Sequence, residues 1–250
     1  MTTATATDYT LPEVGGRHHF LLRRLHSLTG IVFGGYLVIH LLVNATLIEG
    51  SRHDGGPTVF QIQVDKIHSL PFLAVVETLF IYLPILYHTI YGIWITFTGQ
   101  PNIGHYPYAK NVFYTLQRTS AIVIVLFMIF HVFSLKYGFF GAAEGIRFDP
   151  HRATATIGRH MDESWWIVPW LVYPLGILAS CYHLANGLWT AAITWGLTIS
   201  AGAQRRWGYA CGGIFALTLI LGFVALIAAT RIDWRPMLDQ PPTHTVPAPA

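Results

Sequence analysis

The sequence predicts an all-α integral membrane protein, built as a bundle of five transmembrane helices. Of its 250 residues, 53% are hydrophobic and only 11% are charged, whereas a soluble domain carries about 25% charged residues. The mean hydropathy of +0.47 agrees with this imbalance. Uncharged apolar runs recur five times along the chain, and a helix needs roughly 20 such residues to cross a bilayer.

The five runs define the expected helices in chain order. They are residues 28–48, 78–100, 119–135, 164–204 and 207–230. The third run is short, but residues 111–117 extend it across the single charge of Arg118. The fourth is longer than one span requires, and it contains Pro169 and Pro174. We therefore expect one membrane domain over residues 1–250, with the five-helix bundle at residues 23–230.

Three segments outside the spans carry their own expectations. Residues 1–22 are polar, and no small-residue cleavage site follows the first apolar run, so we expect no removable signal peptide. The longest loop, residues 136–163, contains several glycines and is expected to hold only short ordered pieces. Residues 231–250 are rich in proline and are expected to form a flexible tail.

The basic residues near the span ends favour one orientation. Arg23 and Arg24 precede the first span, and Arg205 and Arg206 precede the last. Five spans place these two positions on the same side, and short cytoplasmic segments are enriched in arginine and lysine. We therefore expect the amino terminus in the cytoplasm.

Composition also excludes several cofactors and partners. The two cysteines, Cys181 and Cys211, are too few for an iron–sulfur cluster, which typically takes four. No glycine-rich dinucleotide or phosphate loop follows a strand pattern. Any flavin or cluster must then sit on another subunit. The net charge of +3 is spread over loops, so we expect no nucleic-acid partner.

Four of the thirteen histidines lie inside predicted spans: His40, His88, His131 and His183. An ionisable side chain in the bilayer is costly and points to function. One such histidine could simply tie two helices together, but four on four different helices favour a shared role. With alternating helices, His40 and His131 share a depth near the outer face, and His88 and His183 share a deeper level. The two levels differ by about 15 Å along a helix.

An octapeptide is repeated around the deeper pair. YHTIYGIW (Tyr87–Trp94) returns as YHLANGLW (Tyr182–Trp189). Gly92 and Gly187 stand four residues after the histidines, on the same helical face. A missing side chain there would let a flat macrocycle approach, although close helix packing would also favour glycine.

Two histidines at one depth can ligate one haem iron from both faces. Zinc fits less well because a structural site wants four clustered ligands. The alternative role is that of a transporter or a purely structural anchor, in which the histidines carry protons or pack between helices.

These motifs resemble those of the cytochrome b membrane subunits of succinate:quinone oxidoreductases, in particular the single-anchor, di-haem type. The similar segments are RRLHSLTG (23–30), IHLLVN (39–44), SLPF (69–72), LYHTIYGIWITFTG (86–99), LQRTSAI (116–122), FHVF (130–133), YHLANGLW (182–189) and ITWG (193–196). The resemblance covers nearly all five spans, and several such segments in the same order make chance similarity a poor explanation.

The resemblance implies a function and a set of partners. His40 and His131 would ligate an outer haem b, and His88 and His183 an inner one. An iron–sulfur subunit would dock on the inner face and carry an FAD flavoprotein, so this chain would hold no succinate site. Electrons would reduce a quinone, menaquinone in the two-haem type, at a bacterial plasma membrane. The same anchor could serve a quinol:fumarate reductase, and a higher oligomer of the complex stays open.

The resemblance also implies contacts to the haem propionates and to quinone near the inner face. The residues are His26, Ser27, Arg24 and Arg118. Interfacial arginines and a helix cap would explain the same residues without a cofactor. Seven other histidines are expected to be solvated loop residues: His18, His19, His53, His105, His151, His160 and His244.

Overall fold

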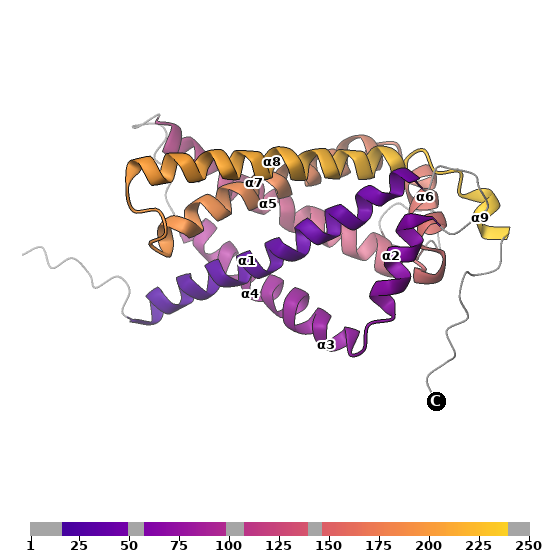
Figure 1. Cartoon of the computed structure of the whole chain (residues 1–250), viewed down its shortest axis with the longest axis horizontal. Coiled ribbons are helices and arrows are strands. Elements are labelled where there is room, and N and C mark those ends of the chain that lie inside the picture. The colour runs from indigo at the N-terminus through magenta and orange to yellow at the C-terminus, as the bar shows by residue number, and fades with distance from the viewer. Residues whose placement is uncertain (1–16, 50–57, 99–107, 140–146, 240–250) are drawn as a thin grey trace, which may run out of the picture.

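The computed structural model of the chain describes residues 17–49, 58–98, 108–139 and 147–239 (Figure 1). Within these ranges all regular structure is helical, which confirms the predicted all-α class. Five helical stretches are long and apolar enough to cross a membrane. They are His18–Glu49, Leu73–Thr98, Asn111–Tyr137, Val168–Thr194 and Ala201–Ala229. The five expected spans are therefore present, in the expected order.

The first span is α1 (Arg17–Ala45), which continues into a 3-10 turn, Thr46–Glu49. It begins well before the apolar run at Leu28, because residues 17–27 contain no proline or glycine to stop a helix. The third span is α5 (Ala109–Tyr137), and the fifth is α8 (Ala201–Ala229). Arg118 lies inside α5, as the extended third run predicts.

The second and fourth spans share an irregularity. The second consists of α3 (Leu73–Glu77), a π-helical turn and α4 (Leu83–Thr98), and the fourth of a π-helical turn and α7 (Tyr173–Thr194). Each π-helical turn, Thr78–Tyr82 or Val168–Val172, ends two residues before a proline, Pro84 or Pro174. Proline lacks an N–H and crowds the preceding turn. A local widening relieves both problems within a continuous span.

The long uncharged run at residues 164–204 contains one span and a turn. Helix α7 ends at Thr194, Gly196 adopts a left-handed conformation (φ +74°), and Ser200 begins α8. The Ala203 N–H donates to Ser200 Oγ at 3.2 Å, a side-chain cap. Hydropathy alone does not show this turn because Leu197 and Ile199 are apolar, although they are 77% and 85% exposed.

Four of the spans form a bundle around the histidines. Helix α1 packs along α4, and α5 packs along α7, while α4 also contacts α5 and α1 contacts α7. Helices α1 and α5 are thus diagonal to each other, as are α4 and α7. Helix α8 covers one side, where it packs on α7 and α1 (Figure 1). We call the end that holds the start of α1 the inner end, and the opposite end the outer end.

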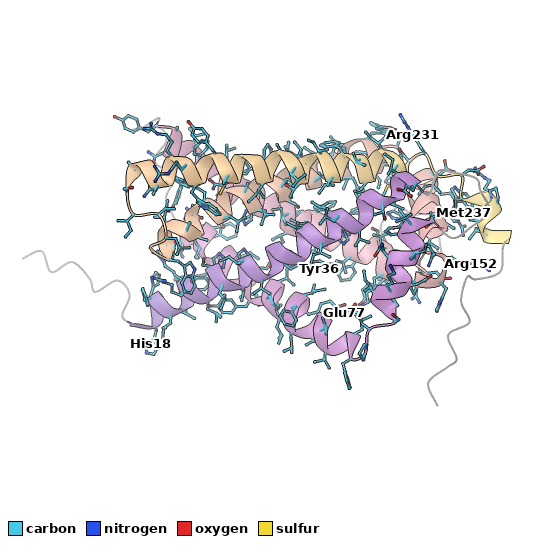
Figure 2. The ribbon with its side chains drawn as sticks, in the orientation of Figure 1. His18, Tyr36, Glu77, Arg152, Arg231 and Met237 are labelled. Carbon is cyan, nitrogen blue, oxygen red and sulfur yellow. The ribbon has the colours of Figure 1, made fainter. Side chains whose placement is uncertain are left out.

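Short helices gather at the outer end of the bundle. They are α2 (Val59–His68), α6 (Ala153–Glu163) and α9 (Arg235–Asp239), shown together in Figure 1. Figure 2 shows Arg152 and Met237 at this end and His18 at the opposite one. Most of α6 is buried, so the loop expected to hold short ordered pieces contains a packed helix. We call α2, α6 and α9 the outer cap.

Specific contacts hold the outer cap. The hydroxyls of Thr58 and Thr154 are 2.6 Å apart, and Trp234 Nε1 donates to Asp162 at 3.0 Å. A Cβ on Gly158 would lie 2.8 Å from the side chain of Ile232. Ile232 and Trp234 are buried, so the first part of the expected tail packs on α6. Residues 1–16 and 240–250 lie outside the described ranges.

Candidate functional site

The structure brings the four histidines of the spans together in two pairs. The ring centroids of His40 on α1 and His131 on α5 are 6.0 Å apart, with an interplanar angle of 90°. Those of His88 on α4 and His183 on α7 are 6.1 Å apart, with an angle of 86°. Each pair spans one diagonal of the bundle, and the pairing is the one that helix depth predicts. Facing helices of a bundle commonly hold cofactors in this way.

The spacing within each pair suits one metal ion between two imidazoles. A bond of about 2 Å on each side, plus about 1.1 Å from each nitrogen to its ring centre, gives centroids about 6 Å apart. Two imidazoles at this distance are too far apart to form a hydrogen bond with each other. No cluster of three or more metal-binding side chains occurs among the described residues. A metal here must bring its other ligands with it, as the iron of a haem does.

Each of the four rings uses its Nδ1 for a hydrogen bond. In the inner pair, His88 Nδ1 donates to the His26 carbonyl at 3.0 Å, and His183 Nδ1 lies 3.2 Å from the Gln117 carbonyl and 3.2 Å from Ser120 Oγ. In the outer pair the partners are tyrosine hydroxyls. His40 Nδ1 lies 3.5 Å from Tyr36, and His131 Nδ1 lies 3.3 Å from Tyr173.

This bonding fixes which nitrogen is available to a metal. A ligating histidine donates its other ring N–H to a carbonyl, hydroxyl or carboxylate, and this bond sets the tautomer and the ring orientation. Within the described part of the chain, no hydrogen bond joins Nε2 of His40, His88, His131 or His183 to another residue. In all four rings, Nε2 is therefore the nitrogen left for a metal.

Buried polar atoms gather at the inner end. His26 Nδ1, Tyr91 Oη, Thr115 Oγ1 and Arg118 Nη1 are buried and have no hydrogen-bond partner among the described residues. The His26 ring stacks on His88, with centroids 4.0 Å apart and an angle of 10°. Buried polar groups are normally paired, because an unpaired one costs stability. Each of these groups can donate a hydrogen bond, and Arg118 adds a positive charge, so the set suits a carboxylate.

Two other predicted contacts lie elsewhere at the inner end. Ser27 Oγ accepts a hydrogen bond from Trp195 Nε1 at 3.0 Å. The guanidinium carbon of Arg24 lies 4.7 Å from the centroid of the Trp195 ring. Both residues therefore face the turn after α7. An apolar pocket of about 350 Å³ lies beside this turn, and Leu28, Trp195 and Trp207 line it.

Comparison with known proteins decides the family. No family model matches the chain. The chain is 32% identical over 216 residues to the "Succinate dehydrogenase cytochrome b558 subunit" of Bacillus subtilis (strain 168). The aligned region covers 86% of this chain and 99% of that protein. The chain belongs to the family of succinate dehydrogenase cytochrome b subunits. It is thus a multi-pass membrane subunit of this family, as the resemblance of its motifs implies.

Three glycines of this cytochrome b subunit face the inner histidine pair or the residues beside it. A Cβ on Gly92 would lie 3.2 Å from Cε1 of His26, and one on Gly187 would lie 3.5 Å from Nε2 of Gln117. A Cβ on Gly30 would lie only 2.6 Å from Cε1 of His88. Gly30 on α1 therefore makes room for the imidazole of His88 itself.

Several residues that contact the histidine pairs are not predicted from the sequence. Tyr36 precedes His40 by one helical turn, so its spacing is a usable signal. Tyr173 and Gln117 are far in sequence from the histidines they contact, and nothing local marks them. His160 was expected to be solvated, but it is fully buried in the outer cap, and its Nε2 lies 3.4 Å from the Tyr173 hydroxyl. That expectation is wrong because the loop folds into α6.

Proposed function

We propose that the chain is the di-haem membrane anchor of a succinate:quinone oxidoreductase. The observation that carries this proposal is the pair of diagonal histidine sites, with centroids 6.0 and 6.1 Å apart and every Nδ1 already engaged. His40 and His131 would hold an outer haem b, and His88 and His183 an inner one. The name of the relative, a cytochrome b subunit, supports haem b as the group.

The chain's own residues would hold, orient and insulate the two groups. When bound, haem b supplies an iron centre that exchanges one electron. Two imidazoles held to each iron would leave no open position, so the site would favour electron transfer over oxygen binding. The unpaired donors of His26 and Arg118 would bind a propionate of the inner haem. Gly92 and Gly187 keep side-chain bulk away from the residues next to the inner pair.

The proposed partners follow from the family. An iron–sulfur subunit, carrying an FAD flavoprotein, would dock at the inner end, where Arg23, Arg24, Arg205 and Arg206 lie near the starts of α1 and α8. The amino terminus would then lie in the cytoplasm of a bacterial cell. Electrons from succinate would pass from the iron–sulfur subunit through this chain to a quinone, with menaquinone proposed. The pocket beside Trp195 is apolar enough to receive part of a quinone or a lipid chain.

Haem content tests the proposal directly. We expect a pyridine haemochrome assay of the purified complex to give two haem b per copy of this chain. A value of one would leave the family intact but remove one of the two sites. A complex without haem b would overturn the proposal and favour a transporter or a structural anchor.

The direction of turnover separates the proposal from its alternative, a quinol:fumarate reductase built on the same anchor. The measurement is the steady-state rate with succinate and a menaquinone analogue, compared with the rate with fumarate and the reduced quinone. We expect the first rate to be the higher one in the purified complex. The opposite ratio would favour the fumarate reductase.

A further inference from the structure

The outer histidine His131 is the start of a hydrogen-bond chain that leaves the bundle. Its Nδ1 lies 3.3 Å from the hydroxyl of Tyr173, the first residue of α7. The same hydroxyl lies 3.4 Å from Nε2 of His160 on α6. His160 is 0% exposed, and Tyr173 is also buried. Side chains from α5, α7 and the outer cap are therefore linked in series, and those of Tyr173 and His160 are buried.

Iron binding at His131 would fix which atom donates and which accepts in each of these hydrogen bonds. This step rests on the proposed function, in which His131 binds iron through Nε2. Its Nδ1 must then carry the proton and donate to the Tyr173 oxygen. The Tyr173 proton is left for His160 Nε2, which accepts it. His160 in turn carries its proton on Nδ1, and this atom is buried without a partner in the described ranges.

That unpaired N–H argues against a mere packing role for His160. A buried donor without a partner costs about 1–3 kcal/mol, whereas an apolar side chain of similar size could fill the same space at no such cost. The histidine has one hydrogen bond within the described residues, and that bond is to Tyr173. The hydrogen bond to Tyr173 therefore accounts for a histidine at this buried position.

The surroundings hold Tyr173 in place. The ring of Phe127 stands edge-on to Tyr173, with centroids 5.5 Å apart, and also stacks on His131 at 5.4 Å. Gly176 leaves the space that Phe127 occupies, because a Cβ there would clash with the phenyl ring. On the other side, α6 is fixed by the contact of Gly158 with Ile232. The phenol therefore has little freedom to turn away from either histidine.

We infer that Tyr173 and His160 are positioning residues that set the orientation and the basicity of His131, and so the reduction potential of the outer haem. A hydrogen bond accepted from the N–H of a ligating histidine makes that ligand a stronger donor to the metal. It therefore stabilises the oxidised iron. Through its bond to Tyr173, His160 increases the electron density on the phenol oxygen that accepts from His131.

Redox titration of the purified complex, followed by optical and electron paramagnetic resonance spectra, tests this inference. In Tyr173→Phe, which lacks the acceptor, we expect the ratio of reduced to oxidised outer haem at a fixed potential to rise three- to tenfold. A tenfold rise corresponds to about 59 mV for one electron. His160→Ala should give a smaller rise. His160→Gln should restore the wild-type ratio, because its amide oxygen can accept from the phenol.

Two internal comparisons separate tuning from general damage. The inner haem of each variant should keep its wild-type ratio. His151→Gln, an exposed residue of the same loop, should leave both haems unchanged. An outer haem with the same potential and spectrum in Tyr173→Phe and His160→Ala as in His151→Gln would overturn the inference. So would an equal shift of both haems.

The result also distinguishes this inference from the proposed function. A wild-type complex without haem b would remove the proposed function itself. Two haems with an insensitive outer potential would leave that function intact and remove only the role of Tyr173 and His160. If Tyr173→Phe fails to assemble, the comparison of His160→Ala with His160→Gln decides: unequal potentials support the inference, and equal ones overturn it.

Discussion

The inner and outer histidine pairs have the same spacing but different supports. The inner rings donate to backbone carbonyls, those of His26 and Gln117, and His183 has Ser120 Oγ as a second partner. The outer rings contact only the hydroxyls of Tyr36 and Tyr173 among the described residues. A carbonyl can only accept, and the helix that contains it fixes its position. A phenol can both accept and donate, so it can pass an interaction on. The inner support therefore comes mainly from the backbone, whereas side chains set the outer one.

The two ends also differ in what they leave unpaired. At the inner end, four buried polar atoms from α1, α4 and α5 lack partners among the described residues. At the outer end, the unpaired buried atoms among the described residues are Nδ1 of His160, next to Tyr173, and Oγ of Ser164 at the end of α6. The inner end is thus suited to an anionic group, while the outer end is closed by the packed outer cap. Variants that affect one end and leave the other as an internal control can test this difference.

The largest expected effect is the selective loss of one site. In His88→Ala the inner pair has one imidazole left, so we expect loss of the inner haem and retention of the outer one. In His131→Ala we expect the reverse, because the pairs lie on different diagonals. Haemochrome content and the low-spin resonance signals of the two haems measure both outcomes. Loss of the outer signal in His88→Ala would show that the pairs are assigned wrongly.

The next effect concerns the space that α1 leaves for the inner ligand. In Gly30→Ala the new methyl would lie 2.6 Å from the His88 ring, which is also confined by its stacking on His26. We expect the free energy of unfolding to fall by about 1–3 kcal/mol, the usual cost of overpacking. We also expect partial loss of the inner haem. Thermal unfolding and haem content are the measurements.

Gly35→Ala is the matched control for that variant. It lies on the same helix, and a Cβ there would meet nothing within 4 Å. Because alanine favours a helix over glycine by up to about 1 kcal/mol, this control should be neutral or slightly stabilising. Equal behaviour of the two variants would mean that His88 can move away from α1.

The pairing of the histidines could be predicted because depth in a helix bundle is a simple function of residue number. His40 and His131, or His88 and His183, need only the rise per residue to be placed at one level. The lateral contacts could not be predicted in this way. Tyr173 reaches His131 across 42 residues of sequence, through the relative rotation of two helices, which no local pattern encodes.

Loops limited the prediction for a different physical reason. His160 lies in a segment with glycines and charges, which reads as solvated, yet α6 is buried by α2, α9 and the ends of the spans. The burial of a short helix depends on partners distant in sequence, such as Ile232 and Trp234. The turn after Thr194 was missed because its exposed residues, Leu197 and Ile199, are themselves apolar.

A smaller effect is expected from the charge at the inner end. Arg118→Gln removes a positive charge, and Nη1 of this arginine is buried without a hydrogen-bond partner among the described residues. A nearby cation favours the more negative, reduced state, so its loss should lower the inner potential by up to about 59 mV, a tenfold change in the ratio. Redox titration measures this shift. The exposed Arg205→Gln at the same end is the control, and an equal shift there would reduce the effect to general surface charge.

The smallest effect is a pH dependence of stability that comes from the outer cap. Burial lowers the pKa of His160 from 6.5 to about 4. Between these values the unfolded chain binds a proton that the folded chain does not, so stability is complete above pH 6.5 and falls as the pH decreases. The loss should be about 0.8 kcal/mol at pH 6 and grow towards pH 4. His160→Gln has no such group, so its melting temperature should change less between pH 7.5 and pH 6 than that of the wild type. Equal changes in the two proteins would mean that water reaches His160 and that the outer cap does not seal the Tyr173 side of the outer pair.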